Sequence, residues 1–369
     1  MAEIFFVAGE ASGDLHASGV AAELRKIRPD LKLAGIGGSR LAAEGVELME
    51  SYEQLAVMGL TEVVRHIPRH YALLRRVRQR LRSGEIRLLI LIDYPGFNMR
   101  LAESAKTAGV PVLYYVTPQV WAWGAKRLPK LARTVTRAAV ILPFEEQLLR
   151  GYGIDAHFVG HPLLDGWERL PTRAAARAVL GIADDAKVLV LYPGSRVQEI
   201  QRHIEPFVRT ARALQKRHPD LQVIISAAPA TETGYSNMPY PVVAAPALTM
   251  FSAADVALCK SGTTTLEAAI AGCPMVVAYR VGKLSYAVAR RLVKISHIGL
   301  VNIVAGREVA REFVQDALDP EVVAQSLDAL LTDGELRRRT IEDLAEVRGK
   351  LGTPGASARV ARMASELVA

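Results

Sequence analysis

Short apolar runs alternate with longer amphipathic stretches along both halves of the chain. The runs are continuous in hydrophobic residues, which is typical of strands buried on both faces of a parallel sheet, and the stretches between them have the length of helices. We therefore predict buried strands at Ile4 to Ala8, Leu31 to Ile36, Leu88 to Ile92, Val112 to Val116 and Ala139 to Leu142, and again at Val188 to Tyr192, Gln222 to Ser226, Val256 to Cys259 and Met275 to Tyr279.

The pattern stops and restarts once. It stops at a segment containing glycine and proline, Gly160 to Leu164, and a new helix is expected from Thr172 to Leu180. A length of 369 residues suits two domains, each with its own core. The sequence thus predicts an α/β protein with two Rossmann-like doubly wound domains. We expect residues 1–164 and a C-terminal helix at about 345–369 in the first, and residues 165–344 in the second.

Composition limits the cellular compartment and the kinds of partner that the sequence predicts. No run approaches the roughly 18 apolar residues of a membrane-spanning helix, and the start lacks a basic leader, so we expect no signal peptide. Cys259 and Cys273 have neither disulfide nor metal-ligand spacing, which favours a reducing cytoplasm. No D-x-D pair of carboxylates occurs, so no metal ion is expected.

The net charge of +8 indicates an anionic partner, which nucleic acid, anionic lipid or a phosphorylated substrate would all satisfy.

The segment Leu60 to Arg82 combines an apolar stripe at helical spacing with many arginines and a single acid, Glu62. This is the composition of a helix that lies on a membrane surface. A helix covering the sheet would show the same stripe but would not need so many arginines. No nucleic-acid motif is present, so no nucleic-acid partner is expected. Membrane contact is predicted for Val63, Val64, Ile67, Leu74, Arg75, Arg76 and Arg78.

In open α/β sheets, ligands bind outside the carboxyl ends of the strands, so residues in the loops after the strands are the candidates for ligand binding and catalysis. The loop Ala8 to His16 could cradle an anion or sugar hydroxyls, or could be a capped turn. Asp93 could accept a proton from a sugar hydroxyl, or cap a helix. Thr117 to Trp123 offers aromatic faces for sugar or acyl groups, or for core packing. The candidate ligand contacts are Glu10, Ser12, Gly13, Asp14, His16, Asn98, Gln119 and Trp121.

Two loops of the second domain suit a diphosphate. In the first, Gly194 allows close backbone approach, Ser195 donates a hydroxyl and Arg196 supplies a fork of donors, although a plain turn is the alternative. In the second, Ser261, Gly262, Thr263 and Thr264 begin a helix, where backbone N–H groups attract anions. Glu267 could bind a ribose diol or only stabilise its helix. The first loop of the chain lacks the G-x-G-x-x-G fingerprint, so no dinucleotide cofactor is expected.

Taken together and in order, these runs resemble the lipid-A-disaccharide synthase family. The similarity extends from residue 8 to beyond residue 300. The matching runs are Ala8 to Asp14, Thr117 to Trp123, Val159 to Pro162, Pro193 to Arg196, Ser261 to Glu267 and Asn302 to Glu308.

The resemblance implies a GT-B glycosyltransferase, with two domains facing across a cleft. It places the acceptor on the N-terminal domain, so the loop residues named there become acceptor-side candidates, and the nucleotide-sugar on the C-terminal domain. The implied reaction transfers 2,3-diacylglucosamine from UDP-2,3-diacylglucosamine to the 6-hydroxyl of 2,3-diacylglucosamine 1-phosphate. It inverts the anomeric centre, uses no metal or cofactor, and yields the β-1′,6-linked disaccharide 1-phosphate and UDP.

The resemblance also implies roles for individual residues. Asp93 matches the general base, and residues 57–82 match a membrane-contact patch. The protein is then expected on an anionic membrane surface, the cytoplasmic face of the inner membrane of a Gram-negative-type bacterium, with a homodimer left open. The UDP-side positions matched are Arg196, Ser261, Gly262, Thr263, Glu267 and Asn302.

Three alternatives remain from the sequence. A UDP-N-acetylglucosamine 2-epimerase would share the architecture and act without an acceptor. The N-acetylglucosaminyltransferase of the peptidoglycan precursor would also have a membrane patch. A basic nucleic-acid-binding protein would fit the charge but not the concentration of arginine on one apolar helix.

Overall fold

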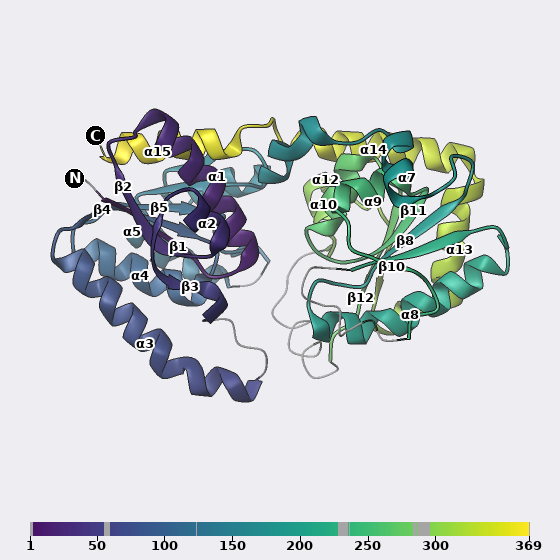
Figure 1. The fold of residues 1–369 in the computed structure, drawn as a ribbon, viewed down its shortest axis with the longest axis horizontal. Helices are drawn as coiled ribbons and strands as arrows, with labels where there is room; N and C mark the ends of the chain where they lie inside the picture. The colour runs from purple at the N-terminus through teal and green to yellow at the C-terminus, as the bar shows by residue number, and fades with distance from the viewer. Residues whose placement is uncertain are drawn as a thin grey trace. The chain divides into compact units, whose positions relative to one another are not determined.

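The computed structural model describes residues 3–54, 60–122, 124–227, 235, 237–282, 286 and 296–368, with the side chains of 54, 60–67, 168 and 169 left out. The chain divides into two compact units (Figure 1). Unit 1 comprises Met1–Asp165 and Gly352–Ala369, and unit 2 comprises Gly166–Leu351.

Unit 1 is built on a parallel sheet of seven strands in the order β3-β2-β1-β4-β5-β6-β7. The side chains of each strand alternate between the two faces, and both faces are covered, so the central strands are apolar throughout. In β1, for example, Phe5 and Val7 enter one core while Ile4 and Phe6 enter the other. The strands are β1 (Glu3–Ala8), β2 (Lys32–Gly37), β3 (Glu47–Ser51), β4 (Ile86–Ile92), β5 (Val112–Tyr115), β6 (Arg137–Val140) and β7 (Ala156–Phe158).

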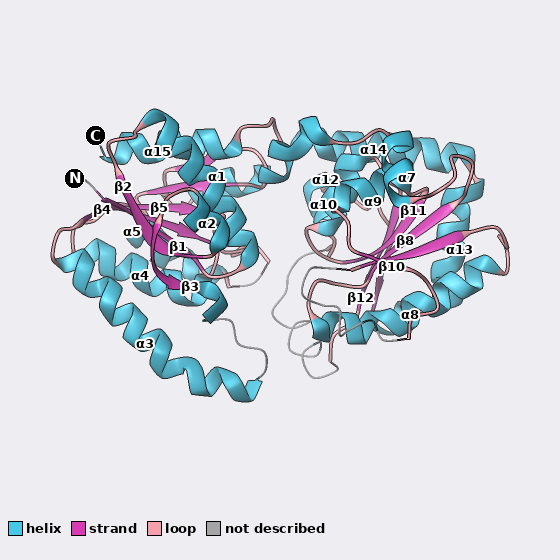
Figure 2. Cartoon of the chain, in the orientation of Figure 1, coloured by secondary structure: helices cyan, strands magenta, loops and turns pink. Residues whose placement is uncertain are grey.

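Helices cover both faces of this sheet (Figure 2). The core of one face takes residues from α3 (Leu60–Arg82), α4 (Pro95–Thr107), α5 (Leu128–Thr134) and α6 (Pro143–Arg150). The core of the other face takes residues from α1 (Ala11–Ile27), α2 (Ser39–Ala43) and α15 (Ala356–Val368). Short 3₁₀ helices in this part of the chain are η1 (Tyr52–Gln54), η2 (Ala125–Arg127) and η3 (Pro162–Arg169), the last of which runs into unit 2.

The last helix, α15, returns to unit 1 after the chain has built unit 2. Its first turn is held by the Asp165 carboxylate, which accepts hydrogen bonds from the backbone N–H groups of Gly355 (2.7 Å) and Ala356 (3.0 Å). The returning segment begins later than the residue near 345 that the sequence suggested. Residues 345–350 continue α14 of unit 2, and the helix ends only before the Gly-Thr-Pro-Gly run at residues 352–355.

Unit 2 repeats the plan with six parallel strands in the order β10-β9-β8-β11-β12-β13. Its strands are β8 (Val188–Tyr192), β9 (Gln222–Ser226), β10 (Val242–Val243), β11 (Val256–Lys260), β12 (Met275–Tyr279) and β13 (Glu312–Val314). Its helices are α7 (Arg173–Leu180), α8 (Val197–Gln215), α9 (Ala247–Ala253), α10 (Thr264–Ala271), α12 (Leu300–Ala305), α13 (Pro320–Thr332), α14 (Gly334–Lys350) and the short η5 (Gln315–Ala317). The prediction of two doubly wound α/β units is confirmed. Of the helices in the described part of the chain, none is long and apolar enough to cross a membrane.

Candidate active site

The sheet of unit 1 reverses its strand order between β1 and β4. In doubly wound sheets, ligands bind outside the carboxyl ends of the strands at such a reversal. The loop that follows β1 begins at Gly9, and the loop that follows β4 begins at Asp93. The two loops touch, because a Cβ atom placed on Gly9 would collide with the ring of Tyr94. The topology thus places the predicted base, Asp93, at the expected ligand site of unit 1.

The backbone at this site is strained. Asp93 and Tyr94 have φ values of 44° and 46°, and Val116, at the end of the adjacent strand β5, has a φ of 56°. Non-glycine residues in this region cost about 1–3 kcal/mol each, and they persist only where the surroundings hold them. Here the carbonyl oxygen of Asp93 accepts hydrogen bonds from Tyr114 Oη (2.7 Å) and Asn98 Nδ2 (2.8 Å). These hydrogen bonds therefore fix the backbone position from which the Asp93 side chain extends.

Tyr94 is fixed as well. Its Oη lies 2.8 Å from His70 Nε2 on α3, and its ring stacks on Phe97 with a centroid separation of 5.6 Å. The Asp93 loop is thereby held between the β1 loop and α3.

Five of the predicted acceptor-side residues, Glu10, Ser12, His16, Gln119 and Trp121, reach the surface of unit 1. Ser12 Oγ donates to Glu10 Oε1 (2.6 Å). Trp121 Nε1 donates to Glu145 Oε1 (3.0 Å), and burial raises the pKa of that Glu145 carboxyl to about 7. The indole of Trp121 is therefore held in one orientation by a buried acid.

Three other predicted contacts do not face solvent. Gly13 is buried beside Ala8 and Ile92. Asp14 is buried, and its carboxylate accepts from the N–H groups of Gly38, Arg40 and Leu41, which start helix α2. Asn98 is buried beneath the Asp93 loop, where its amide donates to the Asp93 carbonyl. Asp14 and the Nδ2 group of Asn98 thus hold backbone groups of unit 1, so ligand contact of these two side chains stays a prediction.

His16 lies beside the ring of Tyr115, with a centroid separation of 6.0 Å. Burial lowers the pKa of His16 to about 4 and that of the neighbouring His161 to about 3. Both imidazoles are therefore neutral near pH 7, and His16 offers a neutral hydrogen-bonding group to a ligand.

The sheet of unit 2 reverses between β8 and β11, and the two predicted diphosphate loops follow these strands. Gly194 has a φ of 143° and Gly262 a φ of 152°, conformations that other residues rarely adopt. A Cβ atom on Gly194 would also lie 2.5 Å from Glu199 Cβ. Both loops therefore depend on glycine for their shape.

An ion pair that the sequence did not predict joins these two loops. Glu199 Oε2 accepts from the Ser195 backbone N–H (3.1 Å), while Glu199 Oε1 lies 2.9 Å from Lys260 Nζ. Arg196, the residue that precedes α8, has a largely exposed side chain whose Nη1 lies 4.0 Å from Glu199 Oε1. The position of Glu199, three residues after that of Arg196, is the one an acid takes in a capping box, and this was the signal that could have revealed it.

The second loop is fixed by hydroxyl groups. Ser261 Oγ donates to the carbonyl of Ile298 (2.6 Å), and Thr265 Oγ1 donates to the carbonyl of Gly262 (2.9 Å). Thr263 is exposed and Thr264 is half-buried at the start of α10. Hydroxyl groups thus hold the backbone of this loop, and its exposed edge stays open to a ligand.

Glu267 follows one turn into α10. Burial raises the pKa of its carboxyl to about 7. Among the hydrogen bonds of the described residues, none reaches this carboxyl. It is therefore available to a ligand.

Asn302 is completely buried, so the predicted contact of its side chain with UDP is wrong. Its Nδ2 donates to the carbonyl of Ala310 (2.6 Å) and to Glu312 Oε1 (2.7 Å), and its Oδ1 accepts from the N–H groups of Val309 and Ala310. Glu312 in turn accepts from the N–H of Ile298, whose carbonyl binds Ser261. Asn302 therefore supports the second loop from beneath.

Helix α3 carries the predicted membrane contacts. Leu74 is only 3% exposed and packs in the core of unit 1 with Leu73, Val77 and Leu81, so its predicted membrane contact is wrong. The side chains of Val63, Val64 and Ile67 lie outside the described residues, as does all of Trp123 in the neighbouring loop.

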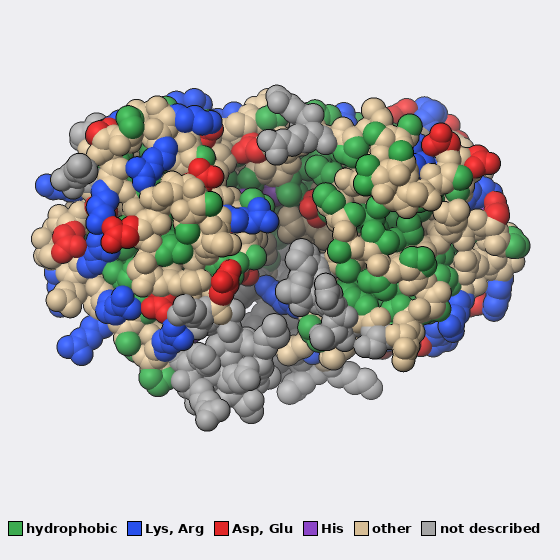
Figure 3. Space-filling view, viewed as in Figure 1, with side chains coloured by type: hydrophobic (Ala, Val, Ile, Leu, Met, Phe, Trp, Pro, Cys, Tyr) green, Lys and Arg blue, Asp and Glu red, His purple; other side chains and the backbone are tan. Residues whose placement is uncertain are grey.

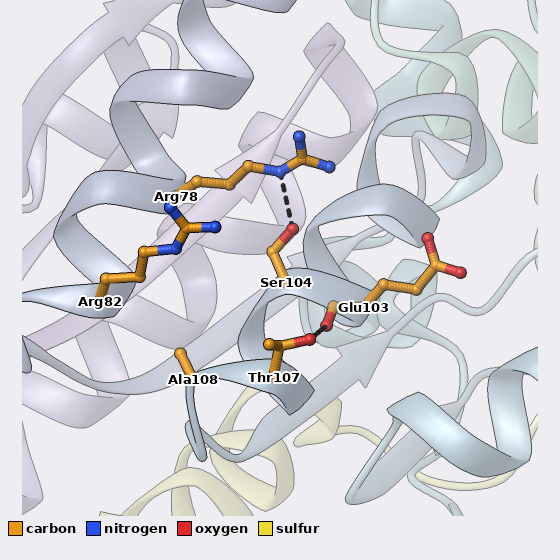
Figure 4. Close-up of a pocket in the computed structure, with 6 residues that line it drawn as sticks. All are labelled: Arg78, Arg82, Glu103, Ser104, Thr107 and Ala108. Atoms are coloured by element: carbon orange, nitrogen blue, oxygen red, sulfur yellow. Dashed lines mark hydrogen bonds between the residues drawn. The ribbon is translucent and has the colours of Figure 1, made fainter.

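The arginines of α3 fall into two stripes at helical spacing. Those of the first stripe are paired: Arg69 and Arg76 with Glu50 (2.5 and 3.1 Å), and Arg80 with Glu3 (2.6 Å). Those of the second stripe are Arg75, Arg78 and Arg82, and among the described residues no carboxylate pairs with them. Arg78 Nε instead donates to Ser104 Oγ of α4 (2.8 Å; Figure 4).

The second stripe borders an open hollow. Arg78 and Arg82 line it on the α3 side, around a volume of about 330 Å³ (Figure 4). The α4 side contributes Glu103, whose carboxylate pairs with Lys130, together with Ser104 and Thr107. In the space-filling view, Lys and Arg side chains gather over the C-terminal half of α3, at the lower left (Figure 3). Within the described part of unit 1, the arginines of this stripe therefore present positive charge with no carboxylate in an ion pair with them.

Within the described ranges, no group of three or more His, Cys, Asp or Glu side chains is placed to hold a metal ion.

Solved structures of other proteins share this two-unit fold. A calicheamicin glycosyltransferase matches with a TM-score of 0.64 at 17% identity, covering 100% of this chain and 98% of that one. The UDP-GlcNAc 2-epimerase from Neisseria meningitidis, solved with UDP-GlcNAc, matches with a TM-score of 0.62 at 14% identity, covering 99% and 98%. At these identities the likeness concerns the fold alone. The chain therefore has the GT-B fold, with a pair of loops at the strand reversal of each unit.

Sequence comparison identifies the family. The family model described as lipid-A-disaccharide synthetase matches residues 4–365. The lipid-A-disaccharide synthases of Syntrophotalea carbinolica and Myxococcus xanthus are 41% and 40% identical to the chain, each over 99% of its length and over 95% and 97% of theirs. The chain belongs to the lipid-A-disaccharide synthase family.

Proposed function

We propose that the protein transfers 2,3-diacylglucosamine from UDP-2,3-diacylglucosamine to the 6-hydroxyl of 2,3-diacylglucosamine 1-phosphate. The products are the β-1′,6-linked lipid A disaccharide 1-phosphate and UDP. Family membership and the GT-B fold support this reaction. The observation that carries it is the strained placement of Asp93 at the strand reversal of unit 1.

Asp93 is the proposed general base. A carboxylate that receives the proton of the 6-hydroxyl makes the acceptor oxygen a better nucleophile. That oxygen attacks the anomeric carbon on the face opposite UDP, so the configuration inverts. The strain at residues 93 and 94 supports this role, because conformations of this cost cluster at functional sites.

Unit 2 is the proposed donor domain. Arg196 and the starts of α8 and α10 offer positive charge to the diphosphate, both before and after its bond to the sugar breaks. Glu267 accepts hydrogen bonds from the ribose diol. These groups act without a metal ion in this proposal.

Helix α3 is the proposed membrane contact, and it would hold the protein on the cytoplasmic face of an anionic inner membrane. The stripe of Arg75, Arg78 and Arg82, with which no carboxylate of the described residues forms an ion pair, supports this role. Tyr71 extends the stripe, is 56% exposed, and lies under the guanidinium of Arg100 (5.7 Å). An exposed aromatic ring with a polar tip is typical of residues at a membrane interface.

The decisive experiment incubates the purified protein with UDP-2,3-diacylglucosamine in EDTA, with and without 2,3-diacylglucosamine 1-phosphate, and follows UDP and the disaccharide product. We expect UDP release that requires the acceptor and survives EDTA. Asp93→Asn should lower turnover at least about 100-fold, the usual contribution of a general base, and leave UDP affinity nearly unchanged. Asp30→Asn, an exposed acid paired with Arg28, serves as the matched control and should retain full activity.

Three other outcomes would each contradict part of this proposal. UDP release without acceptor, or epimerisation of UDP-N-acetylglucosamine, would favour the 2-epimerase reaction. Activity only with the peptidoglycan lipid precursor would favour that transferase. Normal turnover of the Asp93→Asn variant would remove Asp93 from the role of base.

A further inference from the structure

Lys260 is the last residue of β11 and lies between the two loops of the unit 2 site. Its Nζ is 2.9 Å from Glu199 Oε1, and Glu199 holds the backbone of Ser195 in the first loop. The same Nζ lies 3.7 Å from the Cβ position of Gly262 in the second loop. One ammonium group therefore pairs with the acid that holds the first loop and lies beside the second loop.

The ammonium has capacity left for a ligand. A lysine has three N–H donors. Within the described part of unit 2, Glu199 is the one hydrogen-bond acceptor of Lys260. The Tyr279 ring, whose centroid lies 5.8 Å away, attracts the cation through its face. The Lys260 side chain is 19% exposed, so water or an anion can reach it.

Glu199 explains why a second cation belongs here. Its carboxylate shapes the first loop, but it brings a negative charge to a place that should attract a diphosphate. Arg196 Nη1, at 4.0 Å from Glu199 Oε1, and Lys260 Nζ, at 2.9 Å, both approach that carboxylate. Two cations and one anion leave a net positive charge between the loops.

We propose that Lys260 is a second cationic contact for the diphosphate of the nucleotide-sugar, held in place by Glu199 and acting from the opposite loop to Arg196. This inference rests on the proposed donor role of unit 2. When the bond between the anomeric carbon and the diphosphate oxygen breaks, the electron pair stays on that oxygen. Lys260 and Arg196 then stabilise the charge that appears on the departing UDP.

The test compares UDP and uridine binding by titration calorimetry in the full-length protein, with uridine measured by competition against UDP. Lys260→Met keeps the length of the side chain and removes its charge. We expect this variant to bind UDP at least about tenfold more weakly, as for the loss of a charge-assisted hydrogen bond, and to bind uridine as the wild type does. Lys260→Arg should restore most of the UDP affinity. Unchanged UDP affinity in Lys260→Met would overturn the inference.

Glu199→Gln separates direct contact from mere neutralisation. If Lys260 only cancels the charge of Glu199, the double variant Lys260→Met/Glu199→Gln will bind UDP like the wild type, and the inference fails. If Lys260 contacts the diphosphate, the double variant stays several-fold weaker than Glu199→Gln alone. Thermal melting of each variant checks that the fold is intact. A wild-type protein that does not bind UDP would instead refute the proposed donor site itself.

Discussion

The protonation of the Glu267 carboxyl is set by its surroundings. Burial raises its pKa to about 7, so the ionised and neutral forms are both populated near neutral pH. Only the ionised form can accept a hydrogen bond from each ribose hydroxyl without donating one. The affinity for uridine nucleotides should therefore depend on this single proton.

We predict that wild-type UDP affinity rises by about tenfold between pH 6 and pH 8, since the neutral form is lost over this range. Glu267→Gln cannot ionise, so its affinity should change much less and only through the titration of the phosphates. Calorimetric titrations of both proteins across this pH range give the comparison. Parallel pH profiles for the two proteins would show that Glu267 does not bind the ribose.

At the residue scale, the sequence predicts the position of some site residues but not the direction in which their side chains point. Asp93 could be placed at the site because it directly follows a recognisable strand. Asp14 and Asn302 stand in equally suggestive runs, but their side chains turn inward to bind backbone groups. The spacing of Glu199 from Arg196 indicates a helix cap, but its ion pair with Lys260, 61 residues away in the chain, leaves no local signal. Local sequence indicates which loops carry chemistry, and tertiary contacts decide which side chains face the ligand.

At the scale of elements, the two arginine stripes of α3 should have separable effects. Changing Arg75, Arg78 and Arg82 to Gln removes the unpaired stripe, whereas changing Arg69, Arg76 and Arg80 to Gln removes the paired one. Each basic residue near an anionic membrane contributes about 1 kcal/mol, so the first triple variant should bind phosphatidylglycerol vesicles about 100-fold more weakly.

The second triple variant is the matched control, because it loses the same formal charge. It should keep most of its vesicle binding and melt at a lower temperature, since Glu50 loses both of its arginine partners and Glu3 keeps only Lys32. Sedimentation with vesicles at several salt concentrations measures the first effect, and circular dichroism the second. Equal loss of binding in both variants would mean that total charge, and not the stripe facing α4, attracts the membrane.

The central strands of both sheets could be predicted from the sequence, and the edge strands could not. The strands buried on both faces are continuous apolar runs, and each predicted run overlaps a strand in the structure, although the run Ala139 to Leu142 shares only Ala139 and Val140 with β6. The strands β3, β7, β10 and β13 were not predicted. Each lies at or next to an edge of its sheet, is no longer than five residues and carries exposed or half-buried positions. Such short segments leave little hydrophobic pattern in the sequence.

At the scale of the whole molecule, unit 2 is one continuous segment with its own sheet and core, whereas unit 1 needs a helix from the other end of the chain. We predict that residues 166–351 alone fold cooperatively and bind UDP with an affinity of the same order as the full chain. A thermal melt and a UDP titration of this fragment test the prediction. A fragment that folds but does not bind UDP would place the nucleotide site outside unit 2.

The late return of α15 has a consequence for synthesis of the protein. Val360, Ala361 and Ala364 are fully buried in unit 1, yet they are synthesised after the whole of unit 2. Unit 2 can close while translation is still under way, so the part that begins first is completed last, against the usual N-terminal-first order of folding on the ribosome. Until α15 has been synthesised, one face of the first sheet lacks part of its cover. A nascent chain that stalls before residue 352 would therefore expose an apolar surface for chaperones or proteases to recognise.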